Sequence, residues 1–218
     1  MTATRRGRTE AAVGAVGVVV LVSATPGWPA WASYVLVWTV LLAAITVALF
    51  RRPRLGPGTN RVWPIRFTFT WMDVLVGAFV GLLLRAVIIV VELTTFGYVS
   101  SSSSMFAVPH DLLWIATAVI APAVVAPVVE ELFFRGLVLP AIGINWIGIV
   151  ASSIIFSAVH LAHGFNLLTA VSTLIVGIVL GLLAVRTGRL GAGITAHIVY
   201  NASLIAVSEL GGLVSING

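Results

Sequence analysis

Apolar stretches of about 20 residues recur along most of this 218-residue sequence. A helix of about that length crosses a hydrocarbon core of roughly 30 Å. Hydrophobic residues make up 60% of the chain and charged residues only 9%, whereas roughly 25% of the residues in ordinary soluble domains are charged. Because the mean hydropathy is also high, at +1.13, the sequence predicts an all-α integral membrane protein.

The apolar stretches predict about seven transmembrane helices in one bundle. The Arg, Pro and Gly residues of segment 51–66 make a membrane-crossing helix there implausible. No stretch is long enough for a separate soluble domain, so we expect one domain, with three spans and the linker in residues 1–110 and four further spans in residues 111–212. The expected spans are residues 11–24, 30–50, 72–96, 112–139, 146–163, 167–185 and 194–210.

Residues 1–32 allow two interpretations. Three arginines within the first eight residues precede an apolar run, and Ala-Trp-Ala follows it at residues 30–32, which is the pattern of a cleaved signal peptide. The same segment fits a short first membrane helix, a turn at residues 26–29 and a second helix from residue 30. The sequence leaves both interpretations open, and the count of seven uses the second.

The arginines predict how the chain is oriented. A net charge of +5 and a pI near 11.1 do not indicate a nucleic-acid partner here, because the arginines lie at the ends of apolar segments. They occur in the amino-terminal tail, in the linker after the second span, and at Arg186 and Arg189, whereas the turns near Pro26, Ser102 and Gly164 contain none. We expect a multi-pass cell-membrane protein with its amino terminus cytoplasmic and its carboxyl terminus outside.

Charged residues inside the spans need partners, because a charge at mid-bilayer costs about 2.5 to 3.5 kcal/mol on insertion scales. Arg85 and Glu92 in the third span are seven residues apart and share a helix face, so we expect an ion pair. Asp73 lies near the end of the same span and is expected at the membrane interface.

Two GxxxG patterns occur in the third and sixth spans. Gly77 with Gly81, and Gly177 with Gly181, have the spacing that lets two helices approach closely. We interpret all four glycines as packing positions.

The fourth span carries two adjacent carboxylates, Glu130 and Glu131, followed by Arg135. Adjacent residues point about 100° apart on a helix, whereas residues four apart share a face. Arg135 can therefore neutralise Glu131, which leaves Glu130 without a local cation and available for proton transfer. Pro122 and Pro127 lie just upstream and predict a kink, which is tolerated where the backbone lines a cavity.

Two later spans each carry a histidine deep in the membrane. Phe156 and His160 share one helix face in the fifth span, and His197 and Asn201 share one in the seventh. At about 1.5 Å per residue, the two histidines, Asn201 and Glu130 lie at overlapping depths of roughly 5 to 20 Å from the cytoplasmic ends of their spans. This overlap predicts one water-containing cavity, open toward the cytoplasm, that suits water activation better than ion conduction.

These polar residues form three motifs that resemble those of the CAAX-protease and bacteriocin-processing family of intramembrane proteases, also called the abortive-infection family or type II CAAX prenyl endopeptidases. The motifs follow the family's order across about residues 120–205, each on its own predicted helix, and the first three spans match nothing specific. The matches are EExxxR at Glu130, Glu131 and Arg135, FxxxH at Phe156 and His160, and HxxxN at His197 and Asn201.

The resemblance implies a membrane-embedded endopeptidase with its catalytic core in residues 111–212. It implies that Glu130 and His160 activate a water that attacks the scissile carbonyl. It further implies that His197 and Asn201 stabilise the oxyanion, a role suited to preorganised donors in a dry site.

Other features of the site also follow from the resemblance. Glu131, Arg135 and Phe156 would support the catalytic residues. The implied partners are the lipid bilayer and a membrane-associated peptide or a lipidated, CAAX-like protein substrate, and no nucleic acid.

No cofactor is firmly implied, and zinc stays open. Family members are often called metalloproteases, and Glu130, His160 and His197 would supply three zinc ligands with one open position. The zinc motif HExxH and the GxSG and GxGD segments of serine and aspartyl intramembrane proteases are absent from the sequence. The lack of cysteine excludes thiolate nucleophiles and thiolate metal ligands. We favour a metal-free mechanism that uses glutamate and histidine.

Two other functions fit part of the pattern. A non-proteolytic membrane scaffold or bacteriocin-immunity protein of the same fold would bind a peptide or partner, although the intact motifs count against it. A secondary transporter with Glu130 and the histidines as a proton relay predicts inverted repeats, and we find none in the sequence.

Overall fold

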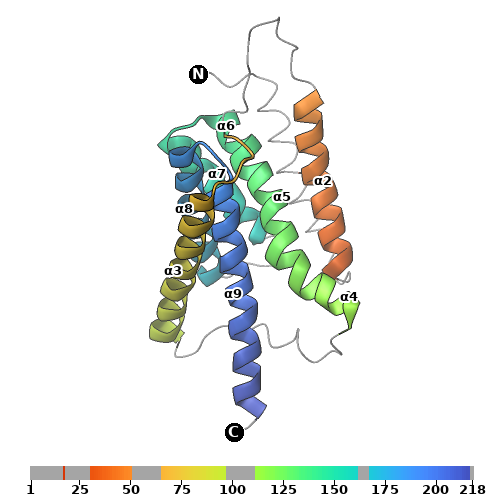
Figure 1. The fold of residues 1–218 in the computed structure, drawn as a ribbon, viewed down its shortest axis with the longest axis vertical. Helices are drawn as coiled ribbons and strands as arrows, with labels where there is room; N and C mark the ends of the chain where they lie inside the picture. Colours follow the sequence, from red (N-terminus) through yellow and green to blue (C-terminus); the bar gives the residue numbers. More distant parts are fainter. Residues whose placement is uncertain (1–16, 18–29, 51–64, 97–110, 162–166, 217–218) are drawn as a thin grey trace, which may run out of the picture.

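The computed structural model describes residue 17 and residues 30–50, 65–96, 111–161 and 167–216. Within these ranges the chain forms a bundle of helices with short connections (Figure 1). A single helical rod runs through residues 112–142, in which α-helical pieces alternate with two wider, π-helical stretches. The other helices are α2 (Ala30–Phe50), α3 (Trp71–Phe96), α7 (Trp146–His160), α8 (Leu167–Thr187) and α9 (Gly191–Ile216).

These helices agree with the second to seventh predicted spans to within a few residues, apart from the carboxyl end of the last. Among the described residues, three helices are both long and apolar enough to cross a membrane, and three shorter ones are also apolar. The predicted first span, apart from Gly17, lies outside the described residues, so neither this span nor the signal-peptide alternative is tested. The helical membrane fold is therefore confirmed, and the count of seven stays a prediction.

The rod through residues 112–142 widens around its prolines. Its pieces are α4 (Leu112–Trp114), the π-helical stretch Ile115–Val125, α5 (Ala126–Phe133), the π-helical stretch Phe134–Val138 and α6 (Leu139–Ile142). In a π-helix each N–H bonds the carbonyl five residues back, and the Ala126 N–H accordingly bonds the Ala121 carbonyl. The next carbonyl, that of Pro122, faces Pro127, which has no N–H to give. Pro127 thus frees the Pro122 carbonyl for a partner on another helix.

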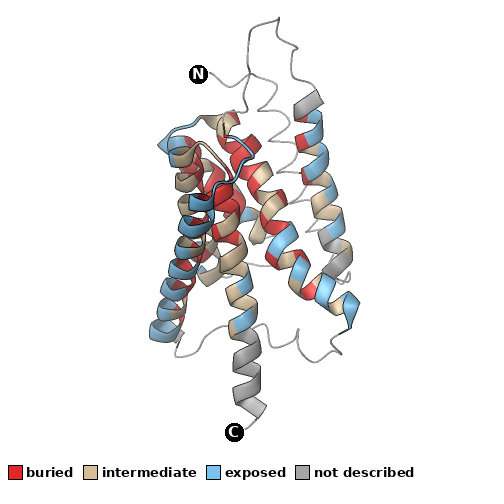
Figure 2. Ribbon diagram, in the orientation of Figure 1, coloured by how far each residue is buried: buried red, intermediate tan, exposed pale blue. Residues whose placement is uncertain are grey.

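Close glycine contacts bring the helices together. A Cβ at Gly77 or Gly81 of α3 would lie 2.6 or 2.5 Å from the Ala192 or Ala196 carbonyl oxygen of α9, and a Cβ at Gly177 of α8 would lie 2.9 Å from Ser153 Cβ of α7. Only glycine permits these approaches, so their interpretation as packing positions is confirmed. The exposed residues of α3 line its outer face, while the buried ones face the bundle (Figure 2).

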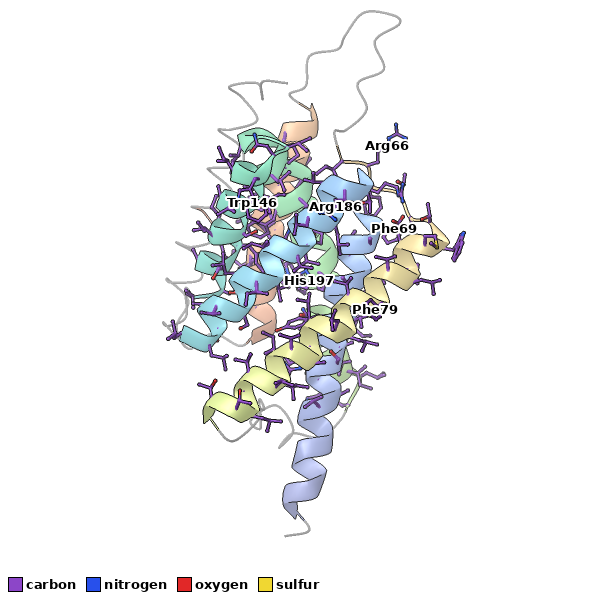
Figure 3. All side chains as sticks on the ribbon, turned by 90° about the vertical axis from the view of Figure 1, so that its left-hand side faces the viewer. Arg66, Phe69, Phe79, Trp146, Arg186 and His197 are labelled. Atoms are coloured by element: carbon purple, nitrogen blue, oxygen red, sulfur yellow. The ribbon has the colours of Figure 1, made fainter. Side chains whose placement is uncertain are left out.

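Three of the described arginines lie at one end of the bundle, where Figure 3 labels Arg66 and Arg186; the third is Arg189. Arg66 pairs with the turn between α8 and α9: its N–H donates to the Gly188 carbonyl at 2.9 Å, and its own carbonyl accepts from Leu190 N–H at 2.8 Å. Arg189 of that turn donates two hydrogen bonds to Asp73, at 2.9 and 3.0 Å. This common end agrees with the arginine pattern, and its cytoplasmic location stays a prediction.

Candidate active site

The innermost part of the polar cluster is a closed ion pair. Glu131 and Arg135 are one turn apart, and Arg135 Nη1 donates to Glu131 Oε1 at 2.7 Å. Arg135 Nη2 donates to the Gly177 carbonyl of α8 at 2.9 Å. Both side chains are almost fully excluded from solvent. The carboxylate expected to be neutralised by Arg135 is therefore held between two helices, in the core of the bundle.

The second carboxylate, Glu130, faces two imidazoles instead of an arginine. Its Oε2 lies 4.0 Å from His160 Nε2 on α7 and 3.8 Å from His197 Nε2 on α9. Neither separation is a direct hydrogen bond. The side chains of Glu130 and His160 keep 17% and 32% of their exposure, whereas His197 keeps 3%. Three helices thus bring one carboxylate oxygen and two ring nitrogens around a common point.

His160 is oriented by its own helix. Its Nδ1 lies 2.8 Å from the Phe156 carbonyl oxygen, one turn earlier. A carbonyl can only accept a hydrogen bond, so the proton of the neutral ring is on Nδ1. The Nε2 atom that faces Glu130 then carries a free lone pair and can accept a proton.

His197 is oriented from outside its helix. Its Nδ1 lies 3.2 Å from Glu131 Oε1, the same oxygen that accepts from Arg135. Because the ionised carboxylate only accepts, Nδ1 donates, and Nε2 is directed to Glu130. The buried ion pair therefore fixes the direction of the second imidazole.

Phe156 links these groups through its ring. The ring packs edge-on against Phe134 at 5.1 Å between centroids, and it lies 4.4 Å from the His160 ring and 5.8 Å from the His197 ring. The Arg135 guanidinium carbon stands 4.7 Å from its centroid, within the range of a cation–π interaction. The FxxxH motif thus supplies both an aromatic wall and the carbonyl that orients His160.

Asn201 approaches the cluster one turn after His197 on α9. Its Nδ2 donates to the free Pro122 carbonyl at 2.8 Å. An amide nitrogen has two hydrogens, and this bond uses one of them. The proline pair therefore positions the asparagine.

A zinc ion would require closer ligands than these residues provide. Zinc bonds of about 2.0 to 2.2 Å place tetrahedral ligand atoms roughly 3.4 Å apart, whereas the separations from Glu130 Oε2 are 4.0 and 3.8 Å. In the part of the chain that the structure describes, no group of three or more His, Cys, Asp or Glu side chains is placed to hold a metal ion. The residues fit zinc in kind but not in spacing.

The structure thus brings together six of the seven residues selected from the sequence, whereas Asn201, one turn along α9 from His197, bonds Pro122 about two turns before Glu130. The chemical roles of all seven stay predictions. The structure also adds three that sequence reasoning did not assign to the site: the Gly177 carbonyl, the Pro122 carbonyl and the Phe134 ring. The five-residue spacing of Pro122 and Pro127 is a sequence signal for the Pro122 carbonyl, because in a π-helix this carbonyl would need an N–H at position 127. Main-chain acceptors such as Gly177 leave no signature in residue type.

Residues 112–203 match the family model described as Type II CAAX prenyl endopeptidase Rce1-like. The matched range contains all three motifs and lies within the predicted four-span core. The resemblance identified from those motifs is therefore confirmed. Together with the apolar helices, the match indicates a membrane protein of the protease class. Neither the curated proteins nor the solved structures gave a match.

Proposed function

We propose that this chain, whose residues 112–203 match the model of Rce1-like type II CAAX prenyl endopeptidases, hydrolyses peptide bonds of membrane-associated or lipidated, CAAX-like proteins inside the bilayer. The observation that carries the proposal is the convergence of Glu130 Oε2 with the Nε2 atoms of His160 and His197, at 4.0 and 3.8 Å. A carboxylate and two imidazoles are general acids and bases, and the partial exposure of Glu130 and His160 gives these two groups access to water.

The first step is activation of water between Glu130 and His160. A separation of 4.0 Å is bridged by a water about 2.8 Å from each atom. One proton of this water passes to Glu130 or to His160 Nε2, and the oxygen attacks the scissile carbonyl carbon. The new C–O bond converts the carbonyl oxygen into an oxyanion.

His197 and Asn201 are suited to stabilise that oxyanion. Glu131 accepts from His197 Nδ1, which keeps the ring turned with Nε2 toward Glu130, where that atom donates a hydrogen bond when it is protonated. The second Nδ2 hydrogen of Asn201 remains for the same purpose, because its first is bonded to Pro122. Donors that are fixed before the reaction need little reorganisation when the charge develops.

Collapse of the tetrahedral intermediate completes the hydrolysis. The C–N bond breaks, and the proton taken from water is returned to the leaving nitrogen by Glu130 or His160. The products are a new carboxylic acid and a new amine, which become carboxylate and ammonium by passing on the remaining proton, so that one water is consumed and the enzyme is regenerated. We propose that no metal takes part, because the spacing of the three side chains is too wide for zinc.

The test is cleavage of a quenched fluorescent, lipidated CAAX peptide by detergent-purified protein, with and without a chelator. We expect cleavage by the wild type that resists the chelator, and none by Glu130→Ala or His160→Ala at unchanged folding. Loss of cleavage in chelator, restored by zinc, would overturn the metal-free mechanism. Wild-type binding of the peptide without cleavage would favour the alternative of a non-proteolytic scaffold or immunity protein.

A further inference from the structure

The buried face of α3 carries two ion pairs of opposite character. Asp73, at the arginine-rich end, accepts two hydrogen bonds from Arg189, at 2.9 and 3.0 Å. Three to five turns further along, Arg85 Nη2 stands 3.9 Å from Glu92 Oε2, which is too far for a hydrogen bond. The predicted Arg85–Glu92 pair is present, but it is open, whereas the Asp73–Arg189 pair is closed.

The open pair leaves strong hydrogen-bonding atoms unused in the core of a membrane protein. Arg85 and Glu92 are each only 4% exposed. Arg85 Nε, Arg85 Nη2 and Glu92 Oε2 have no hydrogen-bond partner. A buried charge without hydrogen bonds is costly in lipid, so this arginine has a strong tendency to bind an incoming acceptor. Its Nε and Nη2 atoms form the guanidinium edge that binds a carboxylate through two parallel bonds.

This guanidinium lies beside the candidate active site. Tyr200 of α9 interacts with the Arg85 side chain and packs on the cluster that contains Leu84 and Ala196. It follows His197 by three residues and directly precedes Asn201. The His197 level and the Tyr200 level, at which Arg85 makes contact, are therefore three residues or about 4.5 Å apart along α9. Two or three extended residues span roughly 7 to 10 Å, so they can reach from one level to the other.

We propose that Arg85 binds the free carboxyl terminus of the substrate and so selects the bond that is cleaved, a role that rests on the proposed peptidase function. With the terminal carboxylate on the Nε and Nη2 edge of Arg85, a peptide bond two or three residues upstream lies at the level of Glu130 and the two histidines. Peptides with a free terminal carboxylate are then preferred over the same peptides with a neutral end.

Glu92 acts as the stand-in anion for Arg85 in the absence of substrate. It offsets the arginine charge from 3.9 Å but satisfies neither free nitrogen. An incoming carboxylate that forms two charge-assisted bonds displaces it. A purely structural ion pair predicts only loss of stability when Glu92 is neutralised. The proposal predicts that Glu92→Gln tightens the binding of acid-ended peptides, because a competitor is removed.

The experiment compares two lipidated peptides that differ only in ending as an acid or as an amide. Cleavage is measured as kcat/KM, and binding is measured by fluorescence anisotropy in a Glu130→Gln background. We expect the wild type to prefer the acid roughly 10- to 100-fold, the scale of a charge-assisted hydrogen bond. Arg85→Gln/Glu92→Gln, which leaves no unpaired charge, should lose this preference by losing acid cleavage while amide cleavage stays constant. The matched control is Asp73→Asn/Arg189→Gln, which neutralises the closed pair and should keep the preference.

Each outcome decides one of the two claims. Equal cleavage of acid and amide by the wild type, or an acid preference that survives in Arg85→Gln/Glu92→Gln, overturns the role of Arg85 and leaves the peptidase function intact. Equal loss of acid and amide cleavage in that variant shows a structural role only and also overturns it. Acid-selective binding that depends on Arg85 but occurs without any cleavage refutes the peptidase function and retains the carboxylate site.

Discussion

Two faces of the same helix carry adjacent carboxylates with opposite surroundings. On one side of α5, Glu131 is 0% exposed and is held by Arg135, one turn later, and by His197 of α9. On the face toward α7 and α9, Glu130 is partly exposed and has two imidazole nitrogens near it but none within hydrogen-bonding distance. Residue type is the same on both faces, so the partners alone distinguish them.

The comparison separates rigidity from reactivity. A buried carboxylate that is bonded to a cation and an imidazole through one oxygen orients its neighbours and stabilises the fold, although its other oxygen, Glu131 Oε2, has no hydrogen-bond partner. A partly exposed carboxylate such as Glu130, which lies near two imidazole nitrogens without a direct hydrogen bond to either, can exchange a proton with water or substrate. The closed face should therefore control stability, and the open face should control turnover.

The largest expected effect is on the closed face. Arg135→Met leaves Glu131 buried without its cation, and breaking a buried pair in this way costs about 3 to 5 kcal/mol. We expect a strongly lowered thermal midpoint in detergent and poor yield of folded protein. Arg135→Met/Glu131→Leu removes both charges and should recover part of the loss. A single variant as stable as the wild type would contradict the distinction between the two faces.

On the open face we expect loss of catalysis with little loss of stability. His160→Gln removes a general base, which is worth roughly 10²- to 10⁴-fold in rate. Its only hydrogen bond described above is to its own helix, and its side chain keeps 32% of its exposure, so the thermal midpoint should stay near that of the wild type. The measurement is kcat on the lipidated peptide beside a melting curve. A destabilisation as large as that of Arg135→Met would show that His160 stabilises the fold, and would contradict the distinction between the two faces.

A smaller effect is expected where α8 supports the closed face. In Gly177→Ala the new Cβ would lie 2.9 Å from Ser153 Cβ, so the helices must move apart at a cost of about 1 to 3 kcal/mol. That movement also withdraws the carbonyl that accepts from Arg135. Gly181→Ala is the matched control one turn on, because its Cβ would meet only side-chain atoms of Ile149, the nearest of which is Cγ2 at 3.1 Å. Equal melting temperatures for the two variants would show that the approach at Gly177 is not limiting.

Sequence reasoning worked where a local rule decides the structure. Apolar length set the helix bounds, and four-residue spacing predicted that Arg135 meets Glu131. Phe156 and His160 were expected on one face for the same reason, and they are in contact. These features depend on helix periodicity alone.

The remainder depends on tertiary contacts that residue types do not encode. That Arg85 and Glu92 form an open pair and not a closed one depends on how α3 sits on α9, and the bond from Asn201 to Pro122 depends on a π-helical stretch. The sequence predicted a kink at the prolines, whereas the structure has a widened, π-helical stretch whose Pro122 carbonyl accepts a hydrogen bond from Asn201. Depth counting grouped the four polar residues but could not say which nitrogen of each histidine faces Glu130.

The most direct test of the account compares Glu130→Gln with Glu131→Gln, two isosteric changes at neighbouring positions. Peptide cleavage and the thermal midpoint are measured on the same detergent preparations. The account predicts that Glu130→Gln abolishes cleavage and melts like the wild type, while Glu131→Gln melts at a clearly lower temperature. Full cleavage by Glu130→Gln would contradict the central claim that this carboxylate activates the attacking water.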